Sequence, residues 1–203
     1  IRPSLVMHHN SNTHPICTRN MSNDENSPPP VVLDNGTGYV KCGFASAEES
    51  PPIVFPSCVG RRVVRFEEAL HNSSLSSPQQ NGLVVVGQDC IDNRQNYEVS
   101  YPIKNGIVTS WPDMILVWEH AIYDELKLTK EEIGNRTILL TEAPQNPIKN
   151  REKMVEIMFT HFGFKGVFVH VQAVLTLYSQ GLMTGLVLDS GDGVSHVVPV
   201  IDG

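Results

Sequence analysis

Hydrophobic and polar positions first form a clear pattern near residue 31, where two short apolar runs flank a glycine-rich turn. Residues 31–33 and 39–44 have the composition of strands, and the turn between them contains an Asn-Gly pair typical of hairpins. Residues 53–59 predict a third strand, and residues 83–86 predict a short further one. The first part of the chain is therefore predicted to be a β-hairpin extended by additional strands.

Helical spacing begins near residue 110. Ser110 resembles a helix N-cap with Asp113 three residues later, and apolar side chains follow at positions 115, 118, 122 and 126. Asn146 is a second candidate cap, Pro147 suits a first helical turn, and Gly163 is expected to end that helix. The pattern therefore predicts two amphipathic helices.

Continuous apolar runs separate these helices. Residues 137–142 and 166–171 are too short for helices and predict buried parallel strands. Residues 172–180 predict a third helix, which Gly181 ends. Strands that alternate with helices are typical of an α/β fold, in which crossover helices connect a mostly parallel sheet.

One pattern occurs twice: an apolar strand, an aspartate and a loop with two glycines. It reads VVLDNGTGYV at residues 31–40 and LVLDSGDGVS at residues 186–195. The repeat predicts an internal duplication of which the first copy alone is complete here. Between the copies, residues 61–82 are rich in Ser, Asn and Gln and predict an exposed insertion.

Composition narrows the class of protein. With 203 residues, 40% of them hydrophobic, the chain has enough apolar side chains for a large core, and its net charge of -7 argues against a nucleic-acid partner. No apolar run approaches the length of a membrane span. Four cysteines without a Cys-x-x-Cys pair indicate a reducing cytosol rather than a disulfide framework or a zinc site. Residues 1–30 predict a disordered arm, and the strand-like end at Gly203 indicates a chain incomplete at its C-terminal end.

The two glycine loops have the chemistry of a phosphate clasp. Glycine lets backbone N–H groups turn toward one ligand and lets a phosphate approach closely. A neighbouring carboxylate would repel phosphate unless a cation intervenes, so Asp34 and Asp189 are predicted to hold Mg²⁺ or Ca²⁺ through water. The predicted phosphate contacts are Gly36, Thr37, Gly38, Lys41, Gly191 and Gly193.

Simpler interpretations stay open for each residue. A single Asp-x-Gly-x-Gly is usually only a hairpin turn, so the hypothesis depends on the repeat. Other phosphate motifs are missing, because there is no Gly-Lys-Ser/Thr and the glycines join strand to strand. Gln172 and His196 are candidates for orienting an attacking water, with packing or capping as the alternative. Asp192 either holds metal or water or shapes its turn.

These loops, together with LTEAPQNPIKNREKM, QAVLTLYSQG and DSGDGVSHVVPV, resemble the actin family over residues 31–203. The resemblance implies the duplicated, ribonuclease H-like ATPase fold that actin shares with heat-shock chaperones and hexokinase. It implies a complete first lobe at 31–181, with an insertion at about 62–100, and a second lobe only begun at 182–203.

The resemblance also assigns site residues, with ATP and Mg²⁺ or Ca²⁺ as cofactors. Lys41 is expected to contact phosphate, and Gln172 and His196 to lie near the attacking water. The two phosphate loops are expected to comprise Asp34, Asn35, Gly36, Thr37, Gly38 and Tyr39, and Asp189, Ser190, Gly191, Asp192, Gly193 and Val194.

Within the family, NGTGYVKCGF, YSQGLMTG and NREKMVEIMF resemble the actin-related proteins that nucleate branched filaments. This implies a cytoplasmic, cytoskeletal subunit that binds actin and the other subunits of such a complex, and at most a slow ATPase. Residues 62–86 lack the His-Gln-Gly and Met-Gly-Met-Gly-Gln-Lys segments of actin's filament contact.

Two other functions stay open: a conventional or divergent actin that polymerises and hydrolyses ATP, and a phosphotransferase or chaperone ATPase of the same fold. Because the family's adenosine pocket lies in its second half, these 203 residues alone are expected to bind ATP weakly or not at all.

Overall fold

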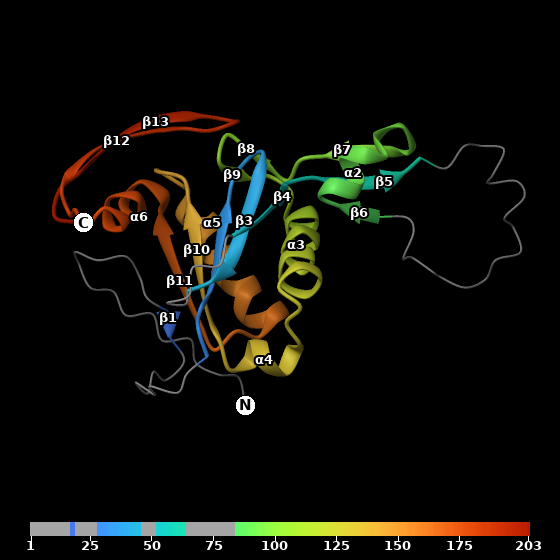
Figure 1. Ribbon diagram of the computed structural model, residues 1–203, viewed down its shortest axis with the longest axis horizontal. Helices are drawn as coiled ribbons and strands as arrows, with labels where there is room; N and C mark the ends of the chain where they lie inside the picture. The colour runs from blue at the N-terminus through green and yellow to red at the C-terminus, as the bar shows by residue number, and fades with distance from the viewer. Residues whose placement is uncertain (1–16, 19–27, 46–51, 64–83) are drawn as a thin grey trace, which may run out of the picture.

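A computed structural model describes residues 17–18, 28–45, 52–63 and 84–203 (Figure 1). Most of the predicted disordered arm, residues 1–16 and 19–27, lies outside the described residues, as do residues 64–83 of the predicted insertion. Within the arm, Cys17–Thr18 form a short strand, β1, that pairs with Gly166 and Val167.

The centre of the molecule is a six-stranded sheet with the order β1-β11-β10-β2-β3-β4 (Figure 1). The three middle strands β11, β10 and β2 run parallel, and β3 and β4 continue the sheet antiparallel. The predicted hairpin at residue 31 and the predicted buried parallel strands are therefore confirmed. The strands are β2 (Val31–Asn35), β3 (Tyr39–Phe44), β4 (Ile53–Pro56), β10 (Thr137–Glu142) and β11 (Gly166–Val171).

Helices cover one face of this sheet and enclose the main core. Alternate residues of β2 and β10 point toward these helices, and the fully buried Trp118 and Met158 pack against them. The helix that runs to Phe162 ends at Gly163, whose left-handed φ of 83° stops it as predicted. The helices are α3 (Trp111–Glu119), continued by a π-helix (His120–Glu125), α4 (Lys130–Gly134), and α5 (Ile148–Ile157), continued by a π-helix (Met158–Phe162).

The first predicted helix cap is at the predicted residue but forms no capping box, and the second lies one residue away from its predicted position. Ser110 is the N-cap residue of α3 but makes no side-chain bond to the helix backbone, and Asp113 pairs with Arg61 instead. The N-cap of α5 is Pro147, not Asn146. The Asn146 amide donates to the buried carboxylate of Glu142, at the end of β10, at 2.9 Å, so this contact with the preceding strand replaces the cap.

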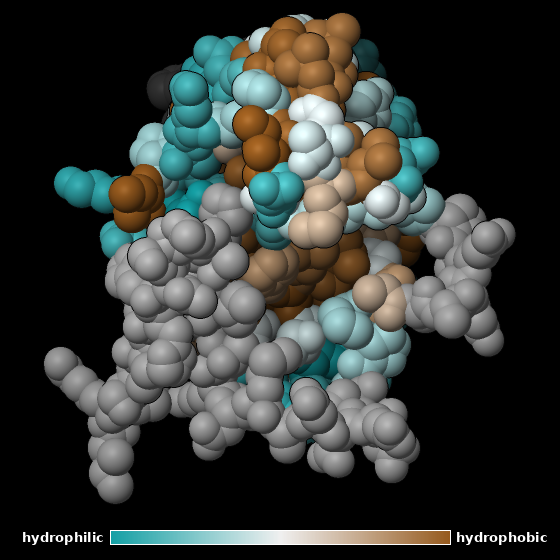
Figure 2. Space-filling model, turned by 90° about the vertical axis from the view of Figure 1, so that its left-hand side faces the viewer, coloured by the Kyte–Doolittle hydropathy of each residue, from teal (hydrophilic) through white to brown (hydrophobic). Residues whose placement is uncertain are grey.

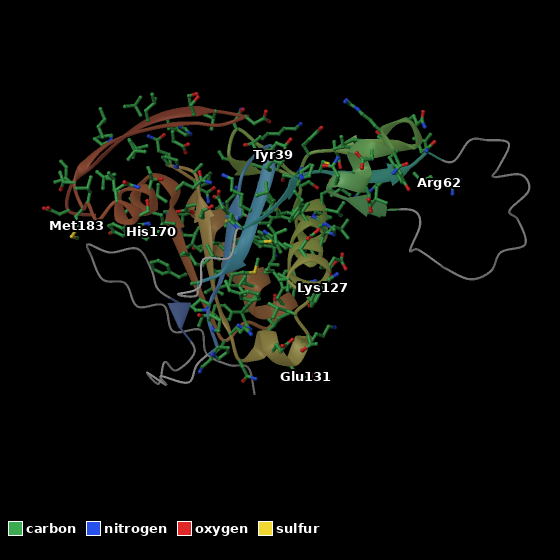
Figure 3. The ribbon with its side chains drawn as sticks, in the orientation of Figure 1. Tyr39, Arg62, Lys127, Glu131, His170 and Met183 are labelled. Atoms are coloured by element: carbon green, nitrogen blue, oxygen red, sulfur yellow. The ribbon has the colours of Figure 1, made fainter. Side chains whose placement is uncertain are left out.

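A second, smaller sheet lies to one side of α3 (Figure 1). Its strand order is β6-β5-β7, and Arg62 marks its outer end in Figure 3. Residues 53–59 do not form the single strand predicted, because β4 pairs with β3 whereas β5 pairs with β6 and β7. The elements here are β5 (Val59–Arg62), β6 (Val84–Val86), α2 (Gln88–Asp92), a 3-10 turn (Arg94–Asn96) and β7 (Tyr97–Ser100), followed by the hairpin β8 (Ile103–Lys104) and β9 (Ile107–Val108).

The C-terminal hairpin is β12 (Gly185–Ser190) and β13 (Ser195–Val200), which among the described residues pair only with each other. Its inner face packs on α6 (Gln172–Ser179), and Gly181 follows that helix with a φ of 70°. Its outer face is apolar and exposed at Leu186, Leu188 and Val197, and hydrophobic side chains gather at this end in Figure 2. Met183 marks the same end in Figure 3. The predicted α/β class and the two glycine hairpins are confirmed.

Candidate functional site

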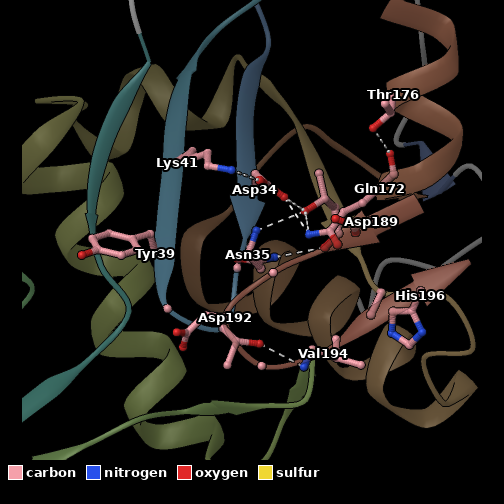
Figure 4. Close-up of a pocket in the computed structure, with 18 of the residues that line it drawn as sticks. Asp34, Asn35, Tyr39, Lys41, Gln172, Thr176, Asp189, Asp192, Val194 and His196 are labelled. Atoms are coloured by element: carbon pink, nitrogen blue, oxygen red, sulfur yellow. Dashed lines mark hydrogen bonds and ion pairs between the residues drawn. The ribbon is translucent and has the colours of Figure 1, made fainter. Parts of the chain in front are cut away.

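The two glycine loops face each other across a cavity of about 520 Å³ (Figure 4). Its walls include nearly all predicted site residues, although they lie far apart in the sequence. Ser190 is the exception, because its hydroxyl bonds Ser195 across the hairpin at 2.7 Å. The predicted residues that line the cavity are Asp34, Asn35, Gly36, Thr37, Gly38, Tyr39, Lys41, Gln172, Asp189, Gly191, Asp192, Gly193, Val194 and His196.

The loops approach so closely that a side chain at either of two glycines would crowd the opposite loop. A Cβ atom added to Gly193 would lie 2.6 Å from the Thr37 side chain. A Cβ atom added to Gly38 would lie 3.0 Å from the side chain of Asp192. Each loop therefore places a glycine against a polar side chain of the other, and the contact closes one end of the cavity.

Asp34 is the centre of a polar cluster at the base of the first loop. Its Oδ1 atom accepts hydrogen bonds from the Thr141 hydroxyl and, at 2.8 Å, from the Gln172 amide (Figure 4). The Lys41 ammonium lies 3.4 Å from Oδ2. These side chains converge because β2 and β10 are parallel neighbours whose carboxyl ends meet at one edge of the sheet.

Sequence reasoning missed Thr141, which follows the apolar run of β10 and makes three hydrogen bonds with the first loop. Its hydroxyl also accepts the Asn35 N–H at 3.1 Å. Its position in the sequence could have identified it, because polar residues at the carboxyl end of a buried parallel strand often belong to a binding site. A second missed residue is Gly106, whose N–H donates to the Thr37 hydroxyl at 3.1 Å.

Asn35 anchors the loop to the core. Its side-chain oxygen, Oδ1, accepts the indole N–H of Trp118 at 2.9 Å, and its side-chain Nδ2 donates to the Thr141 carbonyl at 3.3 Å. Asn35 is 7% exposed and Trp118 is 0% exposed. The side-chain polar groups of Asn35 are thus engaged within the protein, and sequence reasoning missed Trp118 as their partner.

On the second hairpin, Asp189 and His196 are direct partners across the ladder, as Asp34 and Lys41 are on the first. Both line the cavity, and the His196 Nε2 atom is buried without a hydrogen-bond partner among the described residues. Tyr39, in contrast, is largely exposed at the start of β3. The repeat in the sequence is therefore a repeat in geometry.

The carboxylates that line this cavity could supply some, but not most, of the ligands of a bound cation. Among the described residues, no three His, Cys, Asp or Glu side chains are grouped as a metal cage. Asp34 and Asp189 come from different hairpins and line the same cavity. Such a donor set suits Mg²⁺ or Ca²⁺ bound mainly by phosphate oxygens and water.

Comparison with known proteins agrees with the paired glycine loops. Residues 25–203 match the sequence profile of the family described as Actin. The chain belongs to the actin family. The mixed α/β architecture with its central sheet is consistent with the first lobe of the actin-like fold.

Several actin-related proteins are similar to this chain. It is 58% identical over 173 residues to actin-related protein 2 of Oryza sativa subsp. indica, 55% to that of Arabidopsis thaliana and 47% to that of Acanthamoeba castellanii. In each case the match covers 85% of this chain and 42% of the relative. The chain thus spans less than half the length of these relatives. In the described part of the chain, no helix is long and apolar enough to cross a membrane.

Proposed function

We propose that this chain is part of an ATP-binding, actin-related subunit of the complex that nucleates branched actin filaments, the actin-related protein 2/3 complex. One observation carries the nucleotide proposal: two equivalent hairpins place their glycine loops and aspartates around one cavity. The names and identities of the relatives support the assembly role.

The loop tips are the groups that we assign to phosphate. The N–H groups of Gly36 and Gly191 are already bonded inside their own loops, at 3.2 and 3.0 Å. This leaves the amides of residues 37–38 and 192–193 to face a polyphosphate, with Lys41 as the nearby positive charge. ATP would supply that polyphosphate and the leaving group for hydrolysis.

Asp34 and Asp189 would then orient the waters of a Mg²⁺ or Ca²⁺ ion on the phosphates. Gln172 is held against Asp34 by its amide N–H, which leaves its carbonyl oxygen as an acceptor for an attacking water. His196, whose Nε2 atom has no other partner among the described residues, is the second such candidate. We propose hydrolysis that is at most slow, with nucleotide-dependent closure of the two lobes controlling assembly.

The isolated chain should bind ATP weakly or not at all. Each hydrogen bond to a charged group contributes about 1.5–3 kcal/mol, whereas association costs about 4–15 kcal/mol before any net affinity appears. A fluorescent ATP analogue titrated in Mg²⁺ into this chain and into the full-length protein measures the difference. Submicromolar affinity of the isolated chain would refute the reasoning.

The cavity itself is tested in the full-length protein by Gly193→Ala, with Gly43→Ala as the matched control. The added methyl group at Gly193 collides with Thr37, whereas Gly43 has open space around it. We expect at least a tenfold loss of ATP affinity, about 1.4 kcal/mol, from the first change and none from the second. Equal affinities of the two variants would place the nucleotide elsewhere.

Assembly is tested separately, in the cytosolic fraction. The full-length protein, tagged, should co-purify with a second actin-like chain and with the other subunits of the complex. It should stay in the supernatant when salt and Mg²⁺ are added without partners. Pelleting alone under those conditions would instead support a self-polymerising actin.

A further inference from the structure

Two cysteines that are far apart in the sequence meet beside the small sheet. Cys58 lies between β4 and β5, Cys90 lies in α2, and both side chains are completely buried. Each thiol shifts the pKa of the other, because the two side chains lie next to each other. The Cys58 thiol also donates to the Gly87 carbonyl at 3.6 Å. Neither cysteine is part of the nucleotide cavity.

Backbone geometry explains the meeting. The Gly87 N–H donates to the Cys58 carbonyl at 3.1 Å, which continues the β5–β6 ladder by one step. The Cys90 N–H then donates to the Gly87 carbonyl at 3.2 Å, so the chain turns back over β5. Cys58 and Gly60 share one face of the strand, and a Cβ atom on Gly60 would lie 2.8 Å from the Cys90 sulfur. The absent side chain at Gly60 is what lets Cys90 reach Cys58.

We propose that Cys58 and Cys90 are a reversible disulfide site, with a peroxide as the oxidant. One thiolate attacks a peroxide oxygen and becomes a sulfenic acid, releasing hydroxide. The second thiolate attacks the sulfenic sulfur, forms the S–S bond and releases a second hydroxide. The two thiol protons convert these hydroxides to water, and a dithiol reductant reverses the reaction.

The oxidation is slow and depends on pH. Burial, followed by the neighbouring Cys90, raises the pKa of Cys58 to about 12. Burial also raises the pKa of Cys90. Because the thiolate is the attacking species, the rate of oxidation increases as the pH rises.

The bond would act close to the first glycine loop. Ser57, next to Cys58, donates its N–H to the Gly38 carbonyl at 2.9 Å. A disulfide from Cys58 to Cys90 ties α2 and β5 to the point where the chain leaves the main sheet. The oxidised protein therefore has a small sheet held more firmly beside that loop, and hydrogen exchange in α2 slows.

The experiment treats the folded 203-residue chain with hydrogen peroxide at mildly alkaline pH and maps its disulfides by mass spectrometry. One tryptic peptide contains both Cys42 and Cys58, so a second cleavage after Glu49 is needed to separate them. The expected product is one Cys58–Cys90 link, with the loss of two hydrogen atoms, which dithiothreitol reverses.

Cys42→Ser is the matched control, because Cys42 is equally buried but belongs to the main core. That variant should still form the link, whereas Cys58→Ser and Cys90→Ser should not. The unmodified chain in urea provides a comparison that needs no variant. Free thiols at both positions after oxidation, or the same mixture of links in folded and urea-unfolded chains, would overturn the proposal.

Discussion

Replacing Asn35 by alanine tests whether this residue anchors the first glycine loop to the core. The change removes the acceptor of the Trp118 indole N–H and the donor to the Thr141 carbonyl. Trp118 is 0% exposed, so water cannot take the place of the lost oxygen without local opening. The indole N–H would then be a buried donor without a partner.

The size of the effect follows from that unpaired donor. A buried polar group left without a hydrogen bond costs about 1–3 kcal/mol, and the lost side-chain contacts add to it. We therefore expect Asn35→Ala to lower the free energy of unfolding by about 2–3 kcal/mol. For a chain of this length, that corresponds to a fall in the melting temperature of about 4–12 °C.

Urea unfolding followed by circular dichroism measures the change, with Asn135→Ala as the control. The Asn135 side chain is exposed and its amide donates to the Glu131 carbonyl one turn away, so we expect a change below about 0.5 kcal/mol there. Trp118→Phe and the double variant complete a cycle. Their coupling should be about 1 kcal/mol, because either single change breaks the same bond. An Asn35→Ala chain as stable as the control would refute the anchoring role.

Two further predictions concern the framework around the site. Burial raises the pKa of Asp113, but hydrogen bonds from Arg61 and Ser100 outweigh it and hold this pKa below 3.8. The ionised carboxylate thus stabilises the fold above pH 3.8, and this contribution is lost as the pH falls through the lower pKa that Asp113 has in the folded chain. The urea midpoint of Asp113→Asn should therefore depend less on acid pH than that of the unmodified chain. Parallel curves of urea midpoint against pH would contradict this. Gly163→Ala should cost about 1–2 kcal/mol, because its φ of 83° is left-handed while its surroundings are open. Gly134→Ala, in helix α4 with equally open space, should instead stabilise by up to about 1 kcal/mol, and a similar sign at both glycines in thermal unfolding would show that conformation is not the cause.

Much of the fold followed from local patterns. Local patterns predicted the hairpin in residues 31–44, the strand at 137–142 and the helix end at Gly163, because each of these depends on residues close in the sequence. Helix α4 could have been found in the same way, because Thr129 and Glu132 form a capping box that the sequence displays.

Other features depended on which residues become neighbours in the folded chain. Residues 53–59 read as one strand, yet they divide between two sheets, because β4 and β5 find different neighbours. Asn146 has the composition of a cap, but the buried carboxylate of Glu142 competes for its amide. In both cases a partner in the folded structure outweighs the preference that the local pattern indicates.

The sequence by itself determined the two glycine hairpins, their aspartates and the family to which the chain belongs, because each motif consists of residues adjacent in the sequence. Tertiary structure alone decided that Thr141 would bond Asp34, that Trp118 would hold Asn35, and that Cys58 would meet Cys90. Those contacts depend on which strands become neighbours and in what register. That choice belongs to the packing of the whole core, and no local pattern contains it.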